Sequence, residues 1–295
     1  MMAKQQSFSG QLLRDESMAR HCSWRTGGAA ELYYEPADKH DLAEFLALQD
    51  AALPMMWIGL GSNLLVRDGG VKGLVVGALS RLNELEILAD GRVYAEAGVT
   101  CARLARFCKQ HHLFGAEFLA GIPGTVGGAL AMNAGAFGSE TWDFVQSVEM
   151  MSRQGELTMR EKSDFSIDYR TVVKDNNEWF SAGLFNFSTE ELANTTNIKQ
   201  LLQKRNDTQP IGLPSCGSVF KNPPADYAAR LIEACDLKGY CIGGACVSDK
   251  HANFIINSNK ASANDIEDLI AHVQQQVLRQ FQIELQTEVR IVGER

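Results

Sequence analysis

The sequence predicts an α+β protein with two domains, and two observations support this prediction. The chain has 295 residues, about twice the usual size of one domain. Helical spacing of apolar residues and short apolar runs typical of strands both occur along it. Hydrophobic residues make up 45% of the chain and charged residues 22%, which is normal for a protein with a packed core and excludes a disordered chain.

The first part of the chain combines two helices with several short strands. Leu42, Phe45 and Leu46 have helical spacing and predict a helix over residues 37–49. Residues 100–113 read as an amphipathic helix. Strands are predicted at residues 55–58, 64–66, 73–78, 84–88 and 92–97, with turns at Gly70 and at Asp90-Gly91.

The second part begins with strand-like runs at residues 144–151 and 179–187 and a helix at 189–205. Two prolines and a glycine then break the chain within residues 209–214, so we expect a domain boundary there. Beyond it we predict a helix at 225–235, a strand at 252–256, a helix at 262–281 with a Ser262-x-x-Asp265 capping pattern, and a strand at 284–292.

These patterns predict three ranges. Residues 1–208 form the first portion, which has two lobes that meet near residue 78. Residues 209–285 form a separate α+β domain. Residues 286–295 form a carboxyl-terminal strand that returns to the first portion, because a final strand after a long helix often pairs with an earlier sheet.

Composition excludes several classes of function. The net charge of −8 argues against a nucleic-acid binder, which needs a basic face. Seven cysteines without a Cys-x-x-Cys pair or zinc-type spacing predict reduced thiols, a cytoplasmic protein and no metal site. Residues 118–139 carry no charge, but six glycines and Pro123 argue against membrane insertion. The first twenty residues lack the apolar core of a secretory signal. The oligomeric state stays open.

Two glycine-rich loops are candidate phosphate sites. Residues 59–63 (GLGSN) follow a predicted strand, as a dinucleotide fingerprint would, but its last glycine and its helix are missing. They form either a phosphate turn or an ordinary hairpin. Residues 121–128 (GIPGTVGG) precede a possible helix whose amide dipoles would face a pyrophosphate. The alternative is close helix packing through small residues. Neither loop is a Walker loop.

Six motifs occur in order along nearly the whole chain. They are Trp24-Arg25-Thr26-Gly27-Gly28, GLGSNLLV at 59–66, GIPGTVGGALAMNAGAFG at 121–138, DYR at 168–170, PSCGSVFKNP at 214–223 and EVRIVG at 288–293. Together they resemble the UDP-N-acetylenolpyruvoylglucosamine reductases. The segment between Arg170 and Ser218 looks too short for the tyrosine-bearing loop of the first subclass, so the chain resembles the second subclass.

The resemblance implies a fold, a reaction and cofactors. The fold would be an FAD-binding domain of the vanillyl-alcohol-oxidase type with a separate α+β substrate-binding domain. The reaction would be reduction of UDP-N-acetylglucosamine enolpyruvate to UDP-N-acetylmuramate in peptidoglycan synthesis. FAD would be bound tightly without a covalent bond, and NADPH would be the co-substrate, using the same pocket as the sugar nucleotide in turn.

The resemblance also implies three catalytic residues. Arg170 would stabilise the charge that develops on the substrate carboxylate, although a lone arginine is more often a surface salt bridge. Ser218 would donate a proton to the substrate carbon, with Lys221 as a candidate relay, although a turn serine is the alternative. Glu288 would stabilise or protonate the intermediate, although it is otherwise a solvated strand residue.

The remaining implied site residues bind the cofactor or the substrate. The cofactor-binding set is Gly59, Gly61, Ser62, Asn63, Gly121, Ile122, Pro123, Gly124, Thr125, Gly127, Gly128 and Asn133. The substrate-binding set is Arg205, Lys221, Asn222 and Arg290, and for Arg205 an interaction with the dipole of its own helix is an equally good account. Cys216 lacks a histidine partner, so thiol catalysis is not expected, and His251 reads as structural.

Two rival functions remain open. One is a flavin oxidase of the same fold, which would leave the DYR, GSVFKN and EVR motifs unexplained. The other is a catalytically silent protein that binds a flavin or a sugar nucleotide, against which the presence of Arg170, Ser218 and Glu288 argues.

Overall fold

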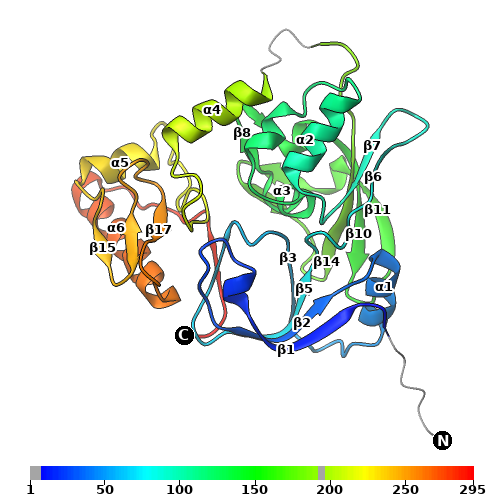
Figure 1. The fold of residues 1–295 in the computed structure, drawn as a ribbon, viewed down its shortest axis with the longest axis horizontal. Helices are drawn as coiled ribbons and strands as arrows, with labels where there is room; N and C mark the ends of the chain where they lie inside the picture. Colours follow the sequence, from blue (N-terminus) through cyan, green and yellow to red (C-terminus); the bar gives the residue numbers. More distant parts are fainter. Residues whose placement is uncertain (1–7, 192–196) are drawn as a thin grey trace, which may run out of the picture. The chain divides into compact units, whose positions relative to one another are not determined.

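The fold was obtained as a computed structural model that describes residues 8–191 and 197–295 (Figure 1). These residues form two compact units, each assembled from separated segments. Unit 1 takes the described residues within Met1–Arg14, Leu32–Gly59 and Gly73–Thr196, and unit 2 takes those within Asp15–Glu31, Leu60–Lys72 and Asn197–Arg295. The chain therefore passes between the units several times, which no single boundary in the sequence can describe.

Helices and short strands are mixed along the chain, as an α+β fold requires. The α-helices are α1 (Lys39–Ala47), α2 (Cys101–Gln110), α3 (Val126–Met132), α4 (Ile198–Thr208), α5 (Ala228–Ala234) and α6 (Ala263–Phe281). Short 3₁₀ turns are η1 (Met18–Arg20), η2 (Glu117–Gly121), η3 (Thr141–Asp143) and η4 (Lys162–Asp164).

The strands are numbered in chain order. The first nine are β1 (Gln11–Ser17), β2 (Ala29–Glu35), β3 (Met55–Ile58), β4 (Leu64–Val66), β5 (Val71–Gly77), β6 (Leu85–Ile87), β7 (Val93–Glu96), β8 (Gly135–Ala136) and β9 (Ser139–Glu140). The others are β10 (Val145–Ser152), β11 (Leu157–Glu161), β12 (Ser166–Asp168), β13 (Thr171–Val173), β14 (Glu178–Phe185), β15 (Cys241–Ile242), β16 (Ala245–Val247), β17 (Ile255–Asn257) and β18 (Arg290–Val292).

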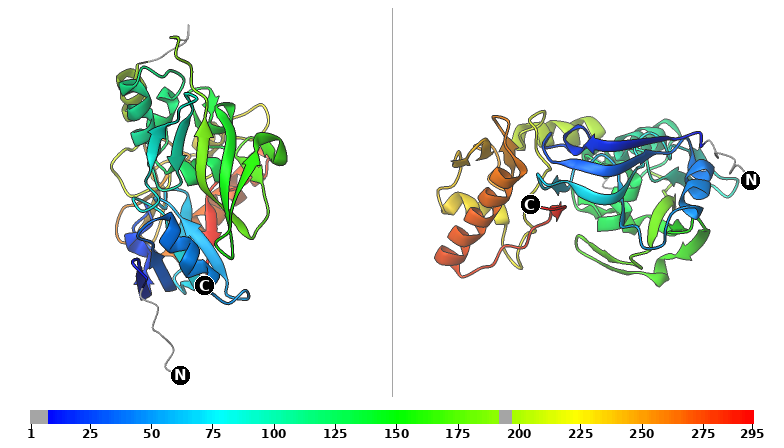
Figure 2. Two further views of the ribbon diagram at one scale, coloured as in Figure 1. Left: turned by 90° about the vertical axis from the view of Figure 1, so that its right-hand side faces the viewer. Right: turned by 90° about the horizontal axis from the view of Figure 1, so that it is seen from below.

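Unit 1 contains a five-stranded sheet in the order β11-β10-β14-β7-β6, whose neighbours are all antiparallel (Figure 2). A second sheet has the order β1-β2-β5-β3, and β5 runs parallel to β3. The apolar face of α1 supplies Leu42, Phe45 and Leu46 to a core that also contains Leu74 and Val76 of β5. Burial of these side chains stabilises the helix, because the isolated helix would be too short to be stable in water.

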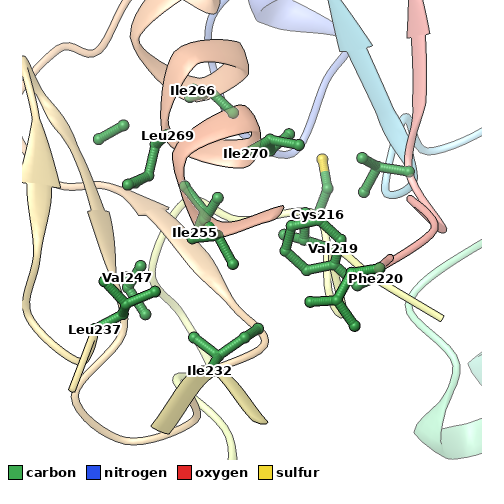
Figure 3. Packing of buried hydrophobic residues seen from close by; sticks show 14 of the residues in the cluster. Cys216, Val219, Phe220, Ile232, Leu237, Val247, Ile255, Ile266, Leu269 and Ile270 are labelled. Atoms are coloured by element: carbon green, nitrogen blue, oxygen red, sulfur yellow. The ribbon is translucent and has the colours of Figure 1, made fainter. Parts of the chain in front are cut away.

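Unit 2 has its own apolar core, shown in Figure 3, where α6 packs against the residues around Val219 and Phe220. Ile266, Leu269 and Ile270 of α6 are almost fully buried there. The sheet β15-β16-β17 is antiparallel, and β18 pairs parallel with β4, with Ile291 opposite Leu65. Within the part of the chain that the structure describes, no helix is both long and apolar enough to cross a membrane.

Most predicted elements are confirmed with small shifts at their ends. The strand at 55–58 is β3, and the helix at 262–281 is α6 with the expected capping box, in which Ser262 accepts from Asp265 N at 3.0 Å. The helix predicted to start at residue 129, directly after the second glycine-rich loop, starts three residues earlier. The helix α3 begins at Val126 because Thr125 accepts from Gly128 N and caps it.

Three other boundaries are wrong for local reasons. The helix predicted at 189–205 begins at Ile198, where Asn197 accepts from Lys199 N, although part of the predicted range lies outside the described residues. The strand predicted at 252–256 begins at Ile255, because Phe254 N closes a turn on His251 O. The last strand is limited to β18, and before it only the bridge between Phe220 and Thr287 is paired as in a strand.

The prediction that all cysteines are reduced is wrong for one pair. Cys241 and Cys246 lie opposite each other on β15 and β16, with Cα atoms 4.1 Å apart, and form a disulfide. The short hairpin between them brings together two residues that are five apart in sequence. The other five cysteines are free thiols.

A buried carboxylate fixes the start of unit 1. Asp41 of α1 accepts hydrogen bonds from Ser9 N at 2.8 Å, Gly10 N at 3.1 Å, Tyr34 Oη at 2.6 Å and Ala37 N at 3.0 Å. Burial alone would raise the pKa of Asp41, but the hydrogen bonds outweigh it and hold the pKa below its ordinary value. The ionised form therefore stabilises the fold.

We predict that Asp41→Asn lowers the free energy of unfolding by about 2–3 kcal/mol at neutral pH, because an amide cannot accept all four bonds. Because the folded pKa lies below the unfolded value, the stabilisation is present above about pH 4 and is lost as the pH falls through the folded pKa. Urea unfolding followed by circular dichroism at pH 7, and at several pH values below 4, measures both effects. Glu44→Gln, an exposed change on the same helix, is the control and should have little effect.

Candidate functional site

The two glycine-rich loops meet in unit 1. A Cβ atom on Gly59 would lie 2.3 Å from Oγ1 of Thr125, which is closer than real Cβ contacts allow. Gly59 directly follows β3, and Thr125 directly precedes α3. The two residues lie more than sixty positions apart in the sequence. The structure thus brings members of both predicted phosphate loops together.

The second loop contains glycines with different roles. A Cβ on Gly127 would lie 2.8 Å from the Cβ of Ala97, and Gly127 N donates to Ala97 O at 2.9 Å. A Cβ on Gly121 would lie 2.5 Å from the ring of Phe137. For these two glycines the packing interpretation explains the residue type. The nearest heavy atom to a Cβ on Gly128 is 3.8 Å away, so packing within the protein does not require glycine there.

The ends of this loop also differ in exposure and hydrogen bonding. Pro123 is exposed, and Ile122 and Gly124 are half-buried. Gly124 N donates to Ile122 O at 3.0 Å. Val126 N donates to Val99 O at 2.8 Å. Some of the main-chain N–H groups that were predicted to face a pyrophosphate therefore donate hydrogen bonds within the protein.

The remaining predicted residues of the first loop belong to unit 2. Gly61 has a φ of +64°, a conformation in which a side chain is unfavourable, and a Cβ there would lie 2.0 Å from His21 O. Ser62 is half-buried. Asn63 donates through Nδ2 to Glu288 O at 3.1 Å, and its own carbonyl accepts from Arg290 N at 3.0 Å. The loop residue Asn63 therefore holds the segment that carries Glu288.

In unit 1, Arg170 and Asn133 form one hydrogen-bonded group. Arg170 lies in the turn between β12 and β13 with a φ of +53°, and its guanidinium donates to Asn133 O at 3.3 Å and Gly135 O at 2.9 Å. Asn133 ends α3 in the left-handed conformation and donates to Glu140 Oε2 at 2.7 Å and to Asp168 O at 3.3 Å. The guanidinium is thus held beside the carboxyl end of α3.

In unit 2, main-chain pairing brings Ser218 and Glu288 close in the fold. Glu288 N donates to Val219 O at 2.7 Å, and Lys221 N donates to Gln286 O at 2.9 Å. Because these two segments run antiparallel, Glu288 lies opposite Val219, the residue after Ser218. Both Ser218 and Glu288 are half-buried. Two of the three predicted catalytic residues therefore lie on, or next to, a pair of hydrogen-bonded main-chain segments.

The predicted substrate-binding residues differ in their surroundings. Asn222 accepts from Ala228 N at 3.1 Å at the start of α5, so its side chain supports that helix. Arg205 lies in the last turn of α4 and donates to Gln209 Oε1 at 2.9 Å, and burial lowers the pKa of its guanidinium. Arg290 is exposed on β18, and Lys221 is half-buried. All four residues belong to unit 2.

Thiol chemistry has no support next to Ser218. Cys216 is 2% exposed, and its Sγ lies 3.5 Å from the carbonyl oxygens of Gly61 and Leu64. Burial raises the pKa of the Cys216 thiol to about 12, so the thiolate that a nucleophile requires is scarce at neutral pH. Among residues 8–191 and 197–295, no three His, Cys, Asp or Glu side chains are grouped so that they could hold a metal ion.

Sequence reasoning missed Asn253, which lies in the turn before β17. It is 4% exposed, and its side chain contacts the main chain of Phe220. Asn253 lies within residues 248–257 (SDKHANFIIN), but a buried asparagine cannot be told from a turn asparagine by residue type alone. A hollow of about 450 Å³ in unit 2, with Arg25, Asp68 and Lys260 in its lining, contains none of the predicted site residues.

Comparison with known proteins gives two family matches. Residues 209–292 match the C-terminal domain of UDP-N-acetylenolpyruvoylglucosamine reductase, and residues 30–159 match an FAD binding domain. The second match contains both glycine-rich loops, and the first contains Ser218 and Glu288.

Individual relatives match along nearly the whole chain. UDP-N-acetylenolpyruvoylglucosamine reductase of Methylococcus capsulatus is 53% identical over 286 residues, which cover 97% of this chain and 94% of the relative. The enzyme of that name from Coxiella burnetii (strain Dugway) is 51% identical over 304 residues, covering 96% of each chain.

A solved structure agrees with these relatives. The crystal structure of UDP-N-acetylenolpyruvylglucosamine reductase from Thermus caldophilus is 26% identical, covers 96% of this chain and 99% of its own, and has a TM-score of 0.79. These matches confirm the resemblance in the sequence and the α+β fold with an FAD-binding domain. This chain belongs to the UDP-N-acetylenolpyruvoylglucosamine reductase family.

Proposed function

We propose that this chain reduces UDP-N-acetylglucosamine enolpyruvate to UDP-N-acetylmuramate with NADPH and tightly bound FAD, and that Arg170, Ser218 and Glu288 carry the chemistry. The reaction supplies a precursor of peptidoglycan. The observation that supports it most is the pairing of the Ser218 and Glu288 segments within a chain that matches this enzyme family over nearly its whole length.

The glycine loops fit the pyrophosphate of FAD. The close approach of Gly59 to Thr125 leaves no room for a side chain between the loops, and Gly128 lacks a packing reason to be glycine. A glycine of that kind lets a backbone approach a phosphate. We assign the pyrophosphate to residues 59–63 and 121–128, and among these Gly121 and Gly127 are glycine because of packing.

FAD, when bound, accepts a hydride from NADPH and delivers it to the substrate double bond. Addition of hydride to the outer carbon of the enolpyruvyl group leaves negative charge on the adjacent carbon, and this charge spreads into the carboxylate. Arg170 would bind that carboxylate, because a guanidinium stays protonated and can donate two parallel hydrogen bonds. Its position on a turn, held by two carbonyl oxygens, limits its freedom before the substrate binds.

Ser218 would donate a proton to the carbon that carries the charge. A serine hydroxyl is a weak acid, so it needs a group that restores its proton, and Lys221, three residues along, is the candidate. Glu288 would stabilise or protonate the same intermediate. Because Glu288 N bonds to Val219 O, the two side chains start from main-chain positions whose separation is fixed.

The functional ranges follow from these assignments. Residues 1–208 would bind FAD, residues 209–285 would bind the sugar nucleotide, and residues 286–295 would return to the first range, where β18 pairs with β4. Arg205, Lys221, Asn222 and Arg290 would contact the sugar nucleotide, and NADPH would use the same pocket in turn. A cytoplasmic location fits the nucleotide-sugar substrate and the five free thiols, whereas the Cys241–Cys246 disulfide does not add to this support.

The first prediction concerns both half-reactions. Under anaerobic conditions, NADPH alone should bleach the flavin absorbance of the purified protein, and UDP-N-acetylglucosamine enolpyruvate should restore it. A yellow protein that bleaches but is not restored would contradict the substrate assignment. Sustained oxygen consumption with an alcohol or hydroxy acid would support an oxidase instead.

The second prediction separates Ser218 from hydride acceptance. Ser218→Ala should leave bleaching by NADPH unchanged and slow reoxidation by the enolpyruvyl substrate about 10²–10⁴-fold, because only the second step needs the proton. Stopped-flow absorbance measures both rates. An equal loss in both half-reactions would exclude Ser218 as the proton donor.

The third prediction tests the phosphate loop. Gly128→Ala should weaken FAD binding about tenfold or more, while the stability of the FAD-free protein stays unchanged or rises by up to about 1 kcal/mol, because alanine favours a helix. Fluorescence titration and thermal unfolding give the two quantities. Retention of wild-type affinity for FAD would remove Gly128 from the phosphate site.

A further inference from the structure

A buried side-chain amide supports the segment that carries Ser218. Asn253 accepts from Phe220 N through Oδ1 at 2.9 Å and donates to Phe220 O through Nδ2 at 2.8 Å. The carbonyl of Asn253 also accepts from Val219 N at 2.9 Å. One residue thus satisfies three main-chain groups next to Ser218, in the way that a neighbouring strand would.

The opposite side of the same segment pairs with the carboxyl-terminal segment. Val219 O accepts from Glu288 N at 2.7 Å and from Val289 N at 3.3 Å. The main chain at Val219 and Phe220 therefore lies between Asn253 and Glu288. Any shift of the peptide that Asn253 holds changes the position of Ser218 relative to Glu288.

Apolar packing alone cannot fix this main chain. Val219 and Phe220 are 0% and 2% exposed, and their side chains belong to the apolar core of unit 2 (Figure 3). The buried N–H and C=O of Phe220 need partners, since an unpaired buried group costs about 1–3 kcal/mol. In this core the side chain of Asn253, 4% exposed, supplies both partners.

We propose that Asn253 is a positioning residue for the proton-transfer step, in which it holds Ser218 in register with Glu288. This inference rests on the proposed function of Ser218. Asn63 acts on the other flank through its bond to Glu288 O, but it also belongs to the loop assigned to FAD. Asn253 is the better residue to test, because it belongs to neither glycine-rich loop.

The test compares Asn253→Ala and the isosteric Asn253→Asp with Asn257→Ala. Asn257 is a matched control: its side chain also bonds two main-chain groups in unit 2, donating to Trp24 O at 2.8 Å and accepting from Ala261 N at 2.7 Å. Each variant is purified with FAD, and rates are given per bound flavin. Bleaching by NADPH and reoxidation by the enolpyruvyl sugar nucleotide are measured separately, together with the solvent deuterium isotope effect on reoxidation.

For the two Asn253 variants we expect bleaching within about twofold of wild type and reoxidation slower by about 10- to 100-fold, since a displacement near 1 Å can cost that much. KM should change little, and the isotope effect should rise as proton transfer becomes rate-limiting. Asn257→Ala should lose stability but keep both rates and the isotope effect.

Three outcomes would overturn the positioning role. They are equal losses in both half-reactions of the Asn253 variants, reoxidation at the wild-type rate, and failure of both variants to fold while Asn257→Ala folds. Absence of reoxidation in the wild-type protein would instead contradict the proposed function, so the two failures are distinguishable.

Discussion

Main-chain pairing of the carboxyl-terminal segment is the constraint on which unit 2 depends. β18 lies parallel to β4, and the residues before it pair with the segment around Phe220. The bridge between Phe220 and Thr287 joins residues more than sixty positions apart in the sequence. The pairing of β18 with β4 joins residues more than two hundred positions apart. Because such pairings fix both register and side-chain direction, the position of Glu288 is set by the fold and not by flexible side-chain contacts.

The surroundings of Ser218 favour its hydroxyl over the neighbouring thiol of Cys216 as the candidate for the proposed proton transfer. Cys216, two residues away, is buried and its thiol stays neutral because burial raises its pKa to about 12. Phe220, two residues beyond Ser218, is held by Asn253 and covered by the apolar core. Ser218 itself is half-buried. Packing thus fixes the neighbours and leaves the serine able to meet a ligand.

Local patterns predicted what depends on local interactions. The capping box of α6 and the apolar stripe of α1 could be predicted because each involves residues within one or two turns. The contact of Gly59 with Thr125 and the bonds from Asn253 to Phe220 could not, since both join distant segments through atoms that no periodicity marks. The disulfide between Cys241 and Cys246 was not predicted for a similar reason. It depends on the register of the hairpin formed by β15 and β16, which the sequence patterns did not predict.

The predicted catalytic residues divide between the units according to the charge they must handle. Arg170 belongs to unit 1, where carbonyl oxygens of Asn133 and Gly135 accept from its guanidinium and orient a permanent cation. Ser218 and Glu288 belong to unit 2, where main-chain hydrogen bonds fix the segments that carry the two residues proposed to act in proton transfer. A cation that binds a carboxylate tolerates small displacements, because its attraction falls off slowly with distance. Proton transfer requires hydrogen-bond distance, so it is the proton-transfer pair that needs a common main-chain frame.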